Sequence, residues 1–256
     1  ICDEKAVMAF VKENEIDVIV NCAAYTAVDK AEDNQELCAK LNSEAVGYLA
    51  KAAEENQAEF IQISTDYVFD GQGTRPWEPD DPVVKPLNVY GQAKYDGEVA
   101  VEKYAPKHYI VRIAWVFGLN GKNFIKTMLG LAATKEHLTI INDQHGVPTS
   151  AELIADITAQ ALRYYLLKDE SVKASLWGHY HLVPTGVTTW YDYAKLIFNL
   201  AEQQGEKLTI QHVEPILTSN YPTPAKRPLN SRLNNEKIQL NFELQLPDWK
   251  QGVAYT

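Results

Sequence analysis

Tyr90 and Lys94 stand four residues apart in the segment Tyr90-Gly-Gln-Ala-Lys94, and together they could transfer a proton. On a helix, residues four apart lie on one face, about one turn from each other. A free tyrosine has a pKa near ~10, and a neighbouring ammonium group stabilises the phenolate and lowers that pKa. Such a pair can protonate a carbinol oxygen while a hydride moves at the carbon. The spacing alone is common, so the surrounding elements must show whether it carries chemistry.

The residues before Tyr90 predict a strand end, a loop and a helix start. Residues 60–64 are mainly apolar and β-branched, as in a buried parallel strand, and hydroxyl side chains follow at Ser64 and Thr65. Residues 70–88 contain four prolines and two glycines, which excludes a helix or a central strand there. A hydroxyl at a strand end, a proline-rich loop and Tyr-x-x-x-Lys at a helix start are more specific together than the pentapeptide alone.

Strands and helices are predicted to alternate, which indicates an α/β fold with a doubly wound parallel sheet, Rossmann-like. Strands are expected at 17–21, 60–64, 108–114 and 138–141, and helices after Asp3, at 34–40, at 43–55 from Ser43, from Tyr90, at 122–133 and at 151–166. Phe10 and Val99 are expected on inward helix faces. After residue 168 the pattern changes to strands at 179–183 and 208–213, a helix at 190–203 and a proline-rich tail. This part predicts a smaller C-terminal lobe over a cleft.

Composition excludes several classes of partner. The chain has 256 residues, 34 acidic against 24 basic, and a net charge of -10, which disfavours nucleic acid and anionic membranes. A few local cations and helix N-termini can still bind one small anionic ligand. No apolar run approaches the roughly 18 residues of a membrane span and no signal peptide is visible, so we expect a cytoplasmic protein. The three cysteines are expected to be reduced thiols.

A series of segments resembles the extended short-chain dehydrogenase/reductases, and the resemblance runs in family order across nearly the whole chain. The segments are Asn21-Cys-Ala-Ala-Tyr-Thr-Ala-Val-Asp29, Ser64-Thr-Asp-Tyr-Val-Phe-Asp-Gly71, Asn88-Val-Tyr-Gly-Gln-Ala-Lys94, Arg112-Ile-Ala-Trp-Val-Phe117, Asn123-Phe-Ile-Lys-Thr-Met128, Asn142-Asp-Gln-His-Gly-Val-Pro-Thr149, Thr188-Thr-Trp-Tyr-Asp192 and Lys226-Arg-Pro-Leu-Asn-Ser231. The branch that it most resembles reduces the C4 keto group of dTDP-4-dehydro-6-deoxy-L-mannose to dTDP-L-rhamnose. NADPH or NADH is then the implied cofactor, and a homodimer is the assembly to test.

The resemblance implies catalytic roles for three residues. Tyr90 would protonate the C4 oxygen of the sugar. Lys94 would lower the pKa of Tyr90 and hydrogen-bond the nicotinamide ribose. Thr65 would donate a hydrogen bond to the same sugar oxygen. Ser64 is the rival for that role, and alignment with the family favours Thr65.

Further residues are implied to bind the cofactor and the substrate. Ala23, Ala24, Tyr25 and Thr26 would line the cofactor, together with Tyr90 and Lys94. Thr65, Asp66, Trp115, Asn123 and Arg227 are expected on the substrate side. Trp115 could instead be a core residue, Asn123 a helix cap and Arg227 a surface cation; as a site residue, Arg227 would bind a diphosphate. The implied cofactor domain is 1–118 plus 149–168, and the implied substrate lobe is 119–148 plus 169–256.

No metal site is predicted. His179 and His181 alternate along one strand, but a third ligand is missing at a useful spacing, so a structural role is favoured. His108, His137, His145 and His212 have no nucleophile near them in the sequence.

The chain departs from the family at its start. It contains no Gly-x-Gly-x-x-Gly turn for a pyrophosphate, and a helix is its first expected element. We therefore expect a longer protein with an additional N-terminal β-α-β portion. Two alternatives remain: a non-catalytic binding or regulatory subunit, or a sugar-nucleotide dehydratase or epimerase. The dehydratases have an Asp-Glu pair after the threonine, whereas Tyr67 follows Asp66 here, which favours plain reduction.

Overall fold

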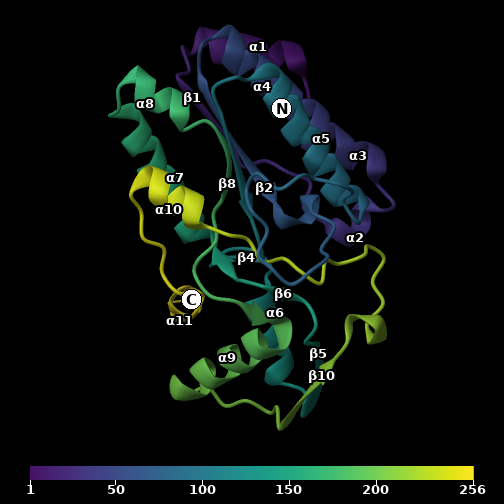
Figure 1. Cartoon of the computed structure of the whole chain (residues 1–256). Coiled ribbons are helices and arrows are strands. Elements are labelled where there is room, and N and C mark those ends of the chain that lie inside the picture. Colours follow the sequence, from purple (N-terminus) through teal and green to yellow (C-terminus); the bar gives the residue numbers. More distant parts are fainter. Residues whose placement is uncertain (256) are drawn as a thin grey trace.

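A parallel sheet of four strands forms the centre of the molecule in the computed structural model, which describes residues 1–255 (Figure 1). Every neighbouring pair in this sheet is parallel. In spatial order the strands are β1 (Val18–Asn21), β2 (Glu59–Thr65), β3 (His108–Ile113) and β8 (Gly178–His181). The predicted Rossmann-like α/β fold is confirmed.

Helices cover both faces of this sheet because alternate side chains of its buried strands point to opposite sides. Phe60 and Ile110 pack on the first face, beneath a group of helices near the N-terminus. On that side lie α1 (Glu4–Glu13), α2 (Val28–Ala31), α3 (Gln35–Ala39), α4 (Ala45–Glu55) and α5 (Val89–Tyr104). Ile61 and Val111 point to the second face. There α7 (Ala151–Leu166), α8 (Glu170–Ser175) and α10 (Glu236–Phe242) cover the sheet.

A smaller lobe extends from the carboxyl ends of the strands, at the lower end of Figure 1. Its main elements are α6 (Phe124–Ala132), β5 (His137–Ile141), α9 (Trp190–Gln203) and β10 (His212–Ile216). β5 and β10 form a separate parallel pair. Two short pairs connect the lobe to the sheet domain: β4 (Val116–Phe117) with β7 (Thr149–Ser150), and β6 (His145–Gly146) with β9 (Thr188–Thr189). The last helix is α11 (Trp249–Ala254).

The structure corrects the predicted domain division. Residues 169–256 were assigned to the lobe as a block, but β8 pairs with β3 and α10 packs against β8 and α7. Both belong to the sheet domain. The strand expected at 138–141 pairs with β10 in the lobe, to which residues 119–148 were assigned, and β10 begins at His212 rather than at residue 208. Apolar periodicity identifies a strand, but it does not identify the strand beside it.

Local predictions from the sequence were partly confirmed and partly wrong. Asp3 caps α1, because its Oδ1 accepts a hydrogen bond of 3.0 Å from the backbone N–H of Ala6. Ser43 does not begin a helix; it lies in a π-helical turn, Lys40–Glu44, that joins α3 to α4. Phe10 and Val99 are 62% and 42% exposed, although their spacing predicted inward positions.

Candidate active site

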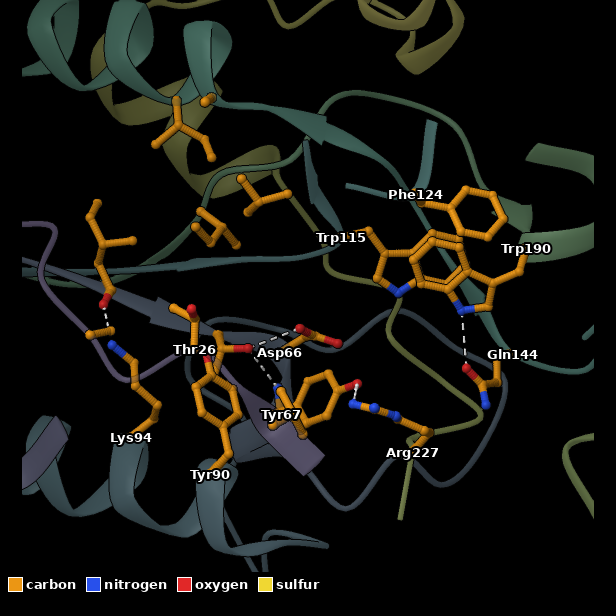
Figure 2. A pocket seen from close by; sticks show the side chains of 18 of the residues that line it. Thr26, Asp66, Tyr67, Tyr90, Lys94, Trp115, Phe124, Gln144, Trp190 and Arg227 are labelled. Carbon is orange, nitrogen blue, oxygen red and sulfur yellow. Dashed lines mark hydrogen bonds between the residues drawn. The ribbon is translucent and has the colours of Figure 1, made fainter. Parts of the chain in front are cut away.

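A cavity of about 1290 Å³ lies where the central strands end and the lobe begins (Figure 2). Ligands of open α/β sheets bind at this edge. Its wall includes residues that follow β1, β2 and β3, together with residues from α5, α6, α7 and β5. The volume exceeds the roughly 300–1,000 Å³ that is usual for a single small-ligand pocket, so two ligands can meet here.

Thr65, Tyr90 and Lys94 all line this cavity, as their sequence positions predicted. Thr65 is the last residue of β2, and the other two lie on the first turns of α5. The side chain of Asn88 begins that helix by accepting a hydrogen bond of 2.8 Å from the backbone N–H of Gly91. A Cβ at Gly91 would collide with the carbonyl of Tyr67, so glycine allows α5 to approach the loop after β2.

Burial controls the charges of Tyr90 and Lys94. It raises the pKa of Tyr90 well above its usual value, and a hydrogen bond with Thr65 opposes this. Burial also lowers the pKa of Lys94 to about 8, although the charge of Glu98 opposes this by stabilising the ammonium. The Lys94 ammonium donates a hydrogen bond of 2.6 Å to the carbonyl of Ile63. The pKa of Tyr90 is therefore raised overall, whereas the sequence analysis expected it to be lowered. The smaller, lowering effect of the Lys94 ammonium stays a prediction.

The geometry distinguishes Thr65 from Ser64. The hydroxyl of Ser64 donates a hydrogen bond of 2.5 Å to Oε1 of Glu98, which is itself ion-paired with Arg112. The hydroxyl of Thr65 lies 3.1 Å from Oδ1 of Asp66 and accepts a hydrogen bond from the backbone N–H of Tyr67. Both residues line the cavity, but the Ser64 hydroxyl is held by Glu98, which favours Thr65; its role as a donor to the substrate stays a prediction.

Asp66 is buried in the cavity wall. Burial raises its pKa to about 6, although hydrogen bonds with Ser231 and Thr65 oppose the rise. Its Oδ2 has no hydrogen-bond partner within residues 1–255. Perturbed carboxyl groups with unused acceptors are typical of ligand sites, which supports the predicted substrate position.

Arg227 is fixed at the cavity by two side chains that the sequence analysis did not select. Its Nη2 lies 2.7 Å from Oδ2 of Asp29, and its Nη1 donates a hydrogen bond of 3.2 Å to the hydroxyl of Tyr67. Burial raises the pKa of Tyr67 to about 12, so this phenol stays neutral. Asp29 and Tyr67 both belong to segments of the family resemblance, which was the only signal for them.

An aromatic stack forms the lobe side of the cavity. The rings of Trp115 and Trp190 lie 3.7 Å apart and 14° from parallel, and Phe124 packs 4.7 Å from Trp190. The indole N–H of Trp190 donates a hydrogen bond of 3.0 Å to Oε1 of Gln144. Trp115 has a backbone φ of +47°, a strained conformation that functional sites often contain. Trp115 was predicted here, whereas Trp190, Phe124 and Gln144 were not singled out.

Three predicted binding residues lie elsewhere. Ala24 and Thr26 line the cavity, but Ala23 and Tyr25 are not part of its wall. The N–H of Tyr25 donates a hydrogen bond of 2.8 Å to Oδ1 of Asn42, and its side chain packs against a small cluster that includes Cys38 and Ala93. Asn123 also lies outside the wall, because its side chain caps α6. Its Oδ1 accepts a hydrogen bond of 3.0 Å from the N–H of Lys126, so Asn123 does cap α6, and its contact with the substrate stays a prediction.

A parallel sheet with a threonine, a tyrosine and a lysine at its carboxyl edge defines a Rossmann-like oxidoreductase of the short-chain dehydrogenase/reductase class. The family described as the RmlD substrate binding domain matches residues 1–256. The dTDP-4-dehydrorhamnose reductase of Salmonella typhimurium is 51% identical over 249 residues, which cover 97% of this chain and 81% of the relative. That of Escherichia coli K12 is 52% identical over 237 residues, covering 93% and 77%.

Solved structures agree with this assignment. The dTDP-4-dehydrorhamnose reductase of Bacillus anthracis, solved in complex with NADP, has a TM-score of 0.88 and 32% identity, and the match covers 99% of this chain and 84% of that one. The chain belongs to the dTDP-4-dehydrorhamnose reductase family and is an oxidoreductase. Family membership favours this over the non-catalytic alternative. No helix within residues 1–255 is long and apolar enough to cross a membrane.

Proposed function

We propose that this protein reduces the C4 keto group of dTDP-4-dehydro-6-deoxy-L-mannose to dTDP-L-rhamnose, with NADPH or NADH as the reductant. The observation that carries the proposal is the meeting of Thr65, Tyr90 and Lys94 on the wall of one cavity at the carboxyl edge of the sheet. The names of the relatives and the NADP bound to the Bacillus anthracis enzyme support the choice of substrate and cofactor.

The residues present fit the nicotinamide end of the cofactor. Ala24 and Thr26 provide a small-residue wall, and the Lys94 ammonium offers donors to ribose hydroxyls beyond its bond to Ile63. When bound, NAD(P)H supplies the hydride that the C4 carbon accepts.

Tyr90 is the proposed proton donor. Because burial raises its pKa, the phenol keeps its proton at neutral pH until an alkoxide forms on the substrate. Hydride addition turns the C4 carbonyl oxygen into an alkoxide, which takes the proton and leaves a phenolate. The Thr65 hydroxyl donates a hydrogen bond to the same oxygen, and the Lys94 ammonium stabilises the phenolate.

The nucleoside diphosphate end of the substrate is proposed to bind at Arg227, beside Tyr67. Arg227, oriented by Asp29 and Tyr67, presents a guanidinium that can bind phosphate oxygens with two parallel hydrogen bonds. The stack of Trp115 on Trp190 offers an apolar surface for a sugar ring. Asp66 provides a free acceptor for a sugar hydroxyl.

Tyr90→Phe tests the proposal against Tyr67→Phe, the other phenol in the same cavity. The two rings are in edge contact, 5.7 Å apart, so both variants keep similar packing. Loss of general acid catalysis should lower kcat of Tyr90→Phe by at least ~100-fold, with the Kd for reduced cofactor unchanged. Tyr67→Phe should instead raise KM for the sugar nucleotide, because Arg227 loses a partner.

The assay follows oxidation of the reduced cofactor by its absorbance with dTDP-4-dehydro-6-deoxy-L-mannose as substrate, and NMR identifies the sugar product. Near-normal kcat in Tyr90→Phe, or a larger loss of kcat in Tyr67→Phe, would contradict the assignment of the proton donor. A wild-type protein that does not oxidise the cofactor with this sugar, while it still binds the cofactor, would contradict the proposed substrate.

A further inference from the structure

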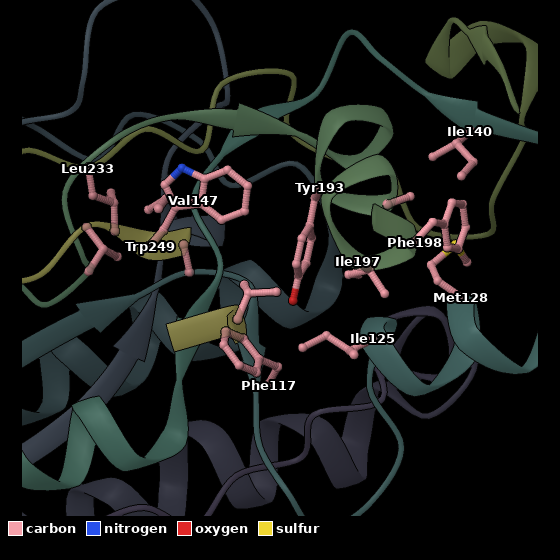
Figure 3. Packing of buried hydrophobic residues seen from close by; sticks show 14 of the residues in the cluster. Phe117, Ile125, Met128, Ile140, Val147, Tyr193, Ile197, Phe198, Leu233 and Trp249 are labelled. Carbon is pink, nitrogen blue, oxygen red and sulfur yellow. The ribbon is translucent and has the colours of Figure 1, made fainter. Parts of the chain in front are cut away.

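Two histidines and a glutamate share the outer face of the strand pair β5·β10. His137 and His212 are direct partners in the parallel register, and Glu214 lies two residues after His212. Side chains alternate along a strand, so all three point to the same side. The opposite face packs on the core of the lobe through Leu138, Ile140 and Val213. Figure 3 shows Ile140 beside the other core residues, and Figure 1 shows β5 and β10 adjacent.

The backbone fixes this pair of strands at both ends. The N–H groups of Gln211 and His212 donate to the carbonyl of Glu136 at 2.8 and 3.0 Å. At the far end, the N–H of Asn142 donates to the carbonyl of Ile216 at 2.9 Å. The two imidazoles are therefore held side by side by the sheet and not by a flexible loop.

The side chains are close enough to share one ion. The imidazole rings are stacked, with centroids 5.1 Å apart and planes 16° from parallel. Nε2 of His137 lies 3.4 Å from Oε2 of Glu214. One ligand atom from each of the three residues can be chosen so that all lie within 4.8 Å of one another. All three side chains are exposed, so they are free to rotate and bring their ligand atoms close enough to coordinate one ion.

Two imidazoles and one carboxylate are the ligands of many zinc sites. Zinc binds such ligands at about 2.0–2.2 Å in a tetrahedron, which places neighbouring ligand atoms roughly 3.4 Å apart. The distance between His137 and Glu214 already agrees with that spacing. Because divalent transition ions prefer imidazole, whereas Mg²⁺ and Ca²⁺ prefer oxygen ligands, the set selects for zinc-like ions.

We propose that His137, His212 and Glu214 bind one Zn²⁺ ion, with water as the fourth ligand. None of the three residues lines the catalytic cavity, so the site is separate from the proposed reduction. The ion would connect two strands that otherwise form only a two-stranded sheet. Residues 138–141 of β5 do line the cavity, so the connection stiffens one of its walls.

Isothermal titration with ZnCl₂, on protein treated with a chelator and then dialysed, tests the site. We expect one ion per chain, and a Kd at least ~10-fold weaker in His212→Gln and in Glu214→Gln. Loss of a residue that only hydrogen-bonds a ligand commonly weakens metal binding ~10–100-fold, so loss of a ligand itself should weaken it at least as much. Zn²⁺ should also raise the Tm of the wild type and not that of His212→Gln.

His108→Gln is the matched control, because His108 and His179 form a second pair across β3 and β8. Their ring centroids lie 6.4 Å apart at 75°, and Glu102 is 3.4 Å from His179. Zinc affinity should be unchanged in His108→Gln. Absence of binding, an unchanged Kd in His212→Gln, or loss of binding in His108→Gln would each overturn the proposal. Equal Tm values of the metal-free wild type and His212→Gln would show that the variant folds.

Discussion

Glu98→Ala should be among the most destabilising single changes in this protein. Glu98 lies on α5 one turn after Lys94, and its side chain is 1% exposed. It accepts hydrogen bonds from Nε and Nη2 of Arg112 at 3.0 and 2.7 Å, and from Ser64 at 2.5 Å. This network joins α5, β2 and β3 directly beneath Thr65 and Lys94.

The size of the loss follows from what the change would leave behind. Arg112 is 3% exposed and cannot lose its proton, so its charge would stay buried without a counter-ion. It would keep one hydrogen bond, 2.9 Å to the carbonyl of Pro79, and a contact with the ring of Phe69 at 4.9 Å. Removing one partner of a buried ion pair typically costs about 3–5 kcal/mol. For a chain of this size that lowers Tm by roughly 10 °C.

Urea denaturation followed by tryptophan fluorescence measures this loss, with an unchanged m-value as the check that the unfolded state is comparable. Glu102→Ala is the matched control, because Glu102 lies one turn further along α5 and is 49% exposed. Its free energy of unfolding should stay within about 0.5 kcal/mol of the wild type.

A double variant separates the buried charge from the lost packing. Glu98→Met combined with Arg112→Met removes both charges and keeps most of the volume, so it should be more stable than Glu98→Ala. A Glu98→Ala loss below about 1 kcal/mol would refute the reasoning. So would a double variant whose loss equals the sum of its two single losses.

Three further changes test the site. Burial raises the pKa of Asp66 from 3.8 to about 6. Between these two values the folded protein keeps a proton that the unfolded chain has already lost. The Asp66 carboxyl therefore lowers the free energy of unfolding as pH rises from about 4 to about 6. In urea unfolding, the free energy of unfolding of Asp66→Asn should therefore rise by up to ~3 kcal/mol relative to that of the wild type between pH 4 and pH 7. A difference between the two proteins that does not change with pH would be evidence against this. Lys94→Ala should weaken cofactor binding and turnover together and shift the alkaline limb of the pH–rate profile upward, because the Tyr90 phenolate loses its ammonium; an unchanged profile would mean that Lys94 does not act on Tyr90. Asn123→Ala should lower the free energy of unfolding by about 1 kcal/mol through loss of the α6 cap, with KM for the sugar nucleotide unchanged; a raised KM at unchanged stability would restore Asn123 as a substrate contact.

Residues next to one another in the chain were predicted well. Thr65 ends a strand and Tyr90 and Lys94 begin a helix, and these local patterns place them at the same edge of a parallel sheet. Ala23, Tyr25 and Asn123 do not line the cavity, and their binding roles stay predictions. Which side chain of an extended segment turns toward a cavity, and whether an asparagine caps or contacts a ligand, depends on the neighbours that fold against it.

The sequence by itself determined the chemistry proposed for the site, because the types of the proposed catalytic residues and the elements that carry them are local properties. Only the tertiary structure decided the partners: Arg227 meets Asp29 from 198 residues away, and Trp115 stacks on Trp190. It also decided the direction of the pKa shifts at the site. Desolvation raises the pKa of Tyr90 and lowers that of Lys94, and desolvation depends on packing from several parts of the chain, which no local pattern of residues describes.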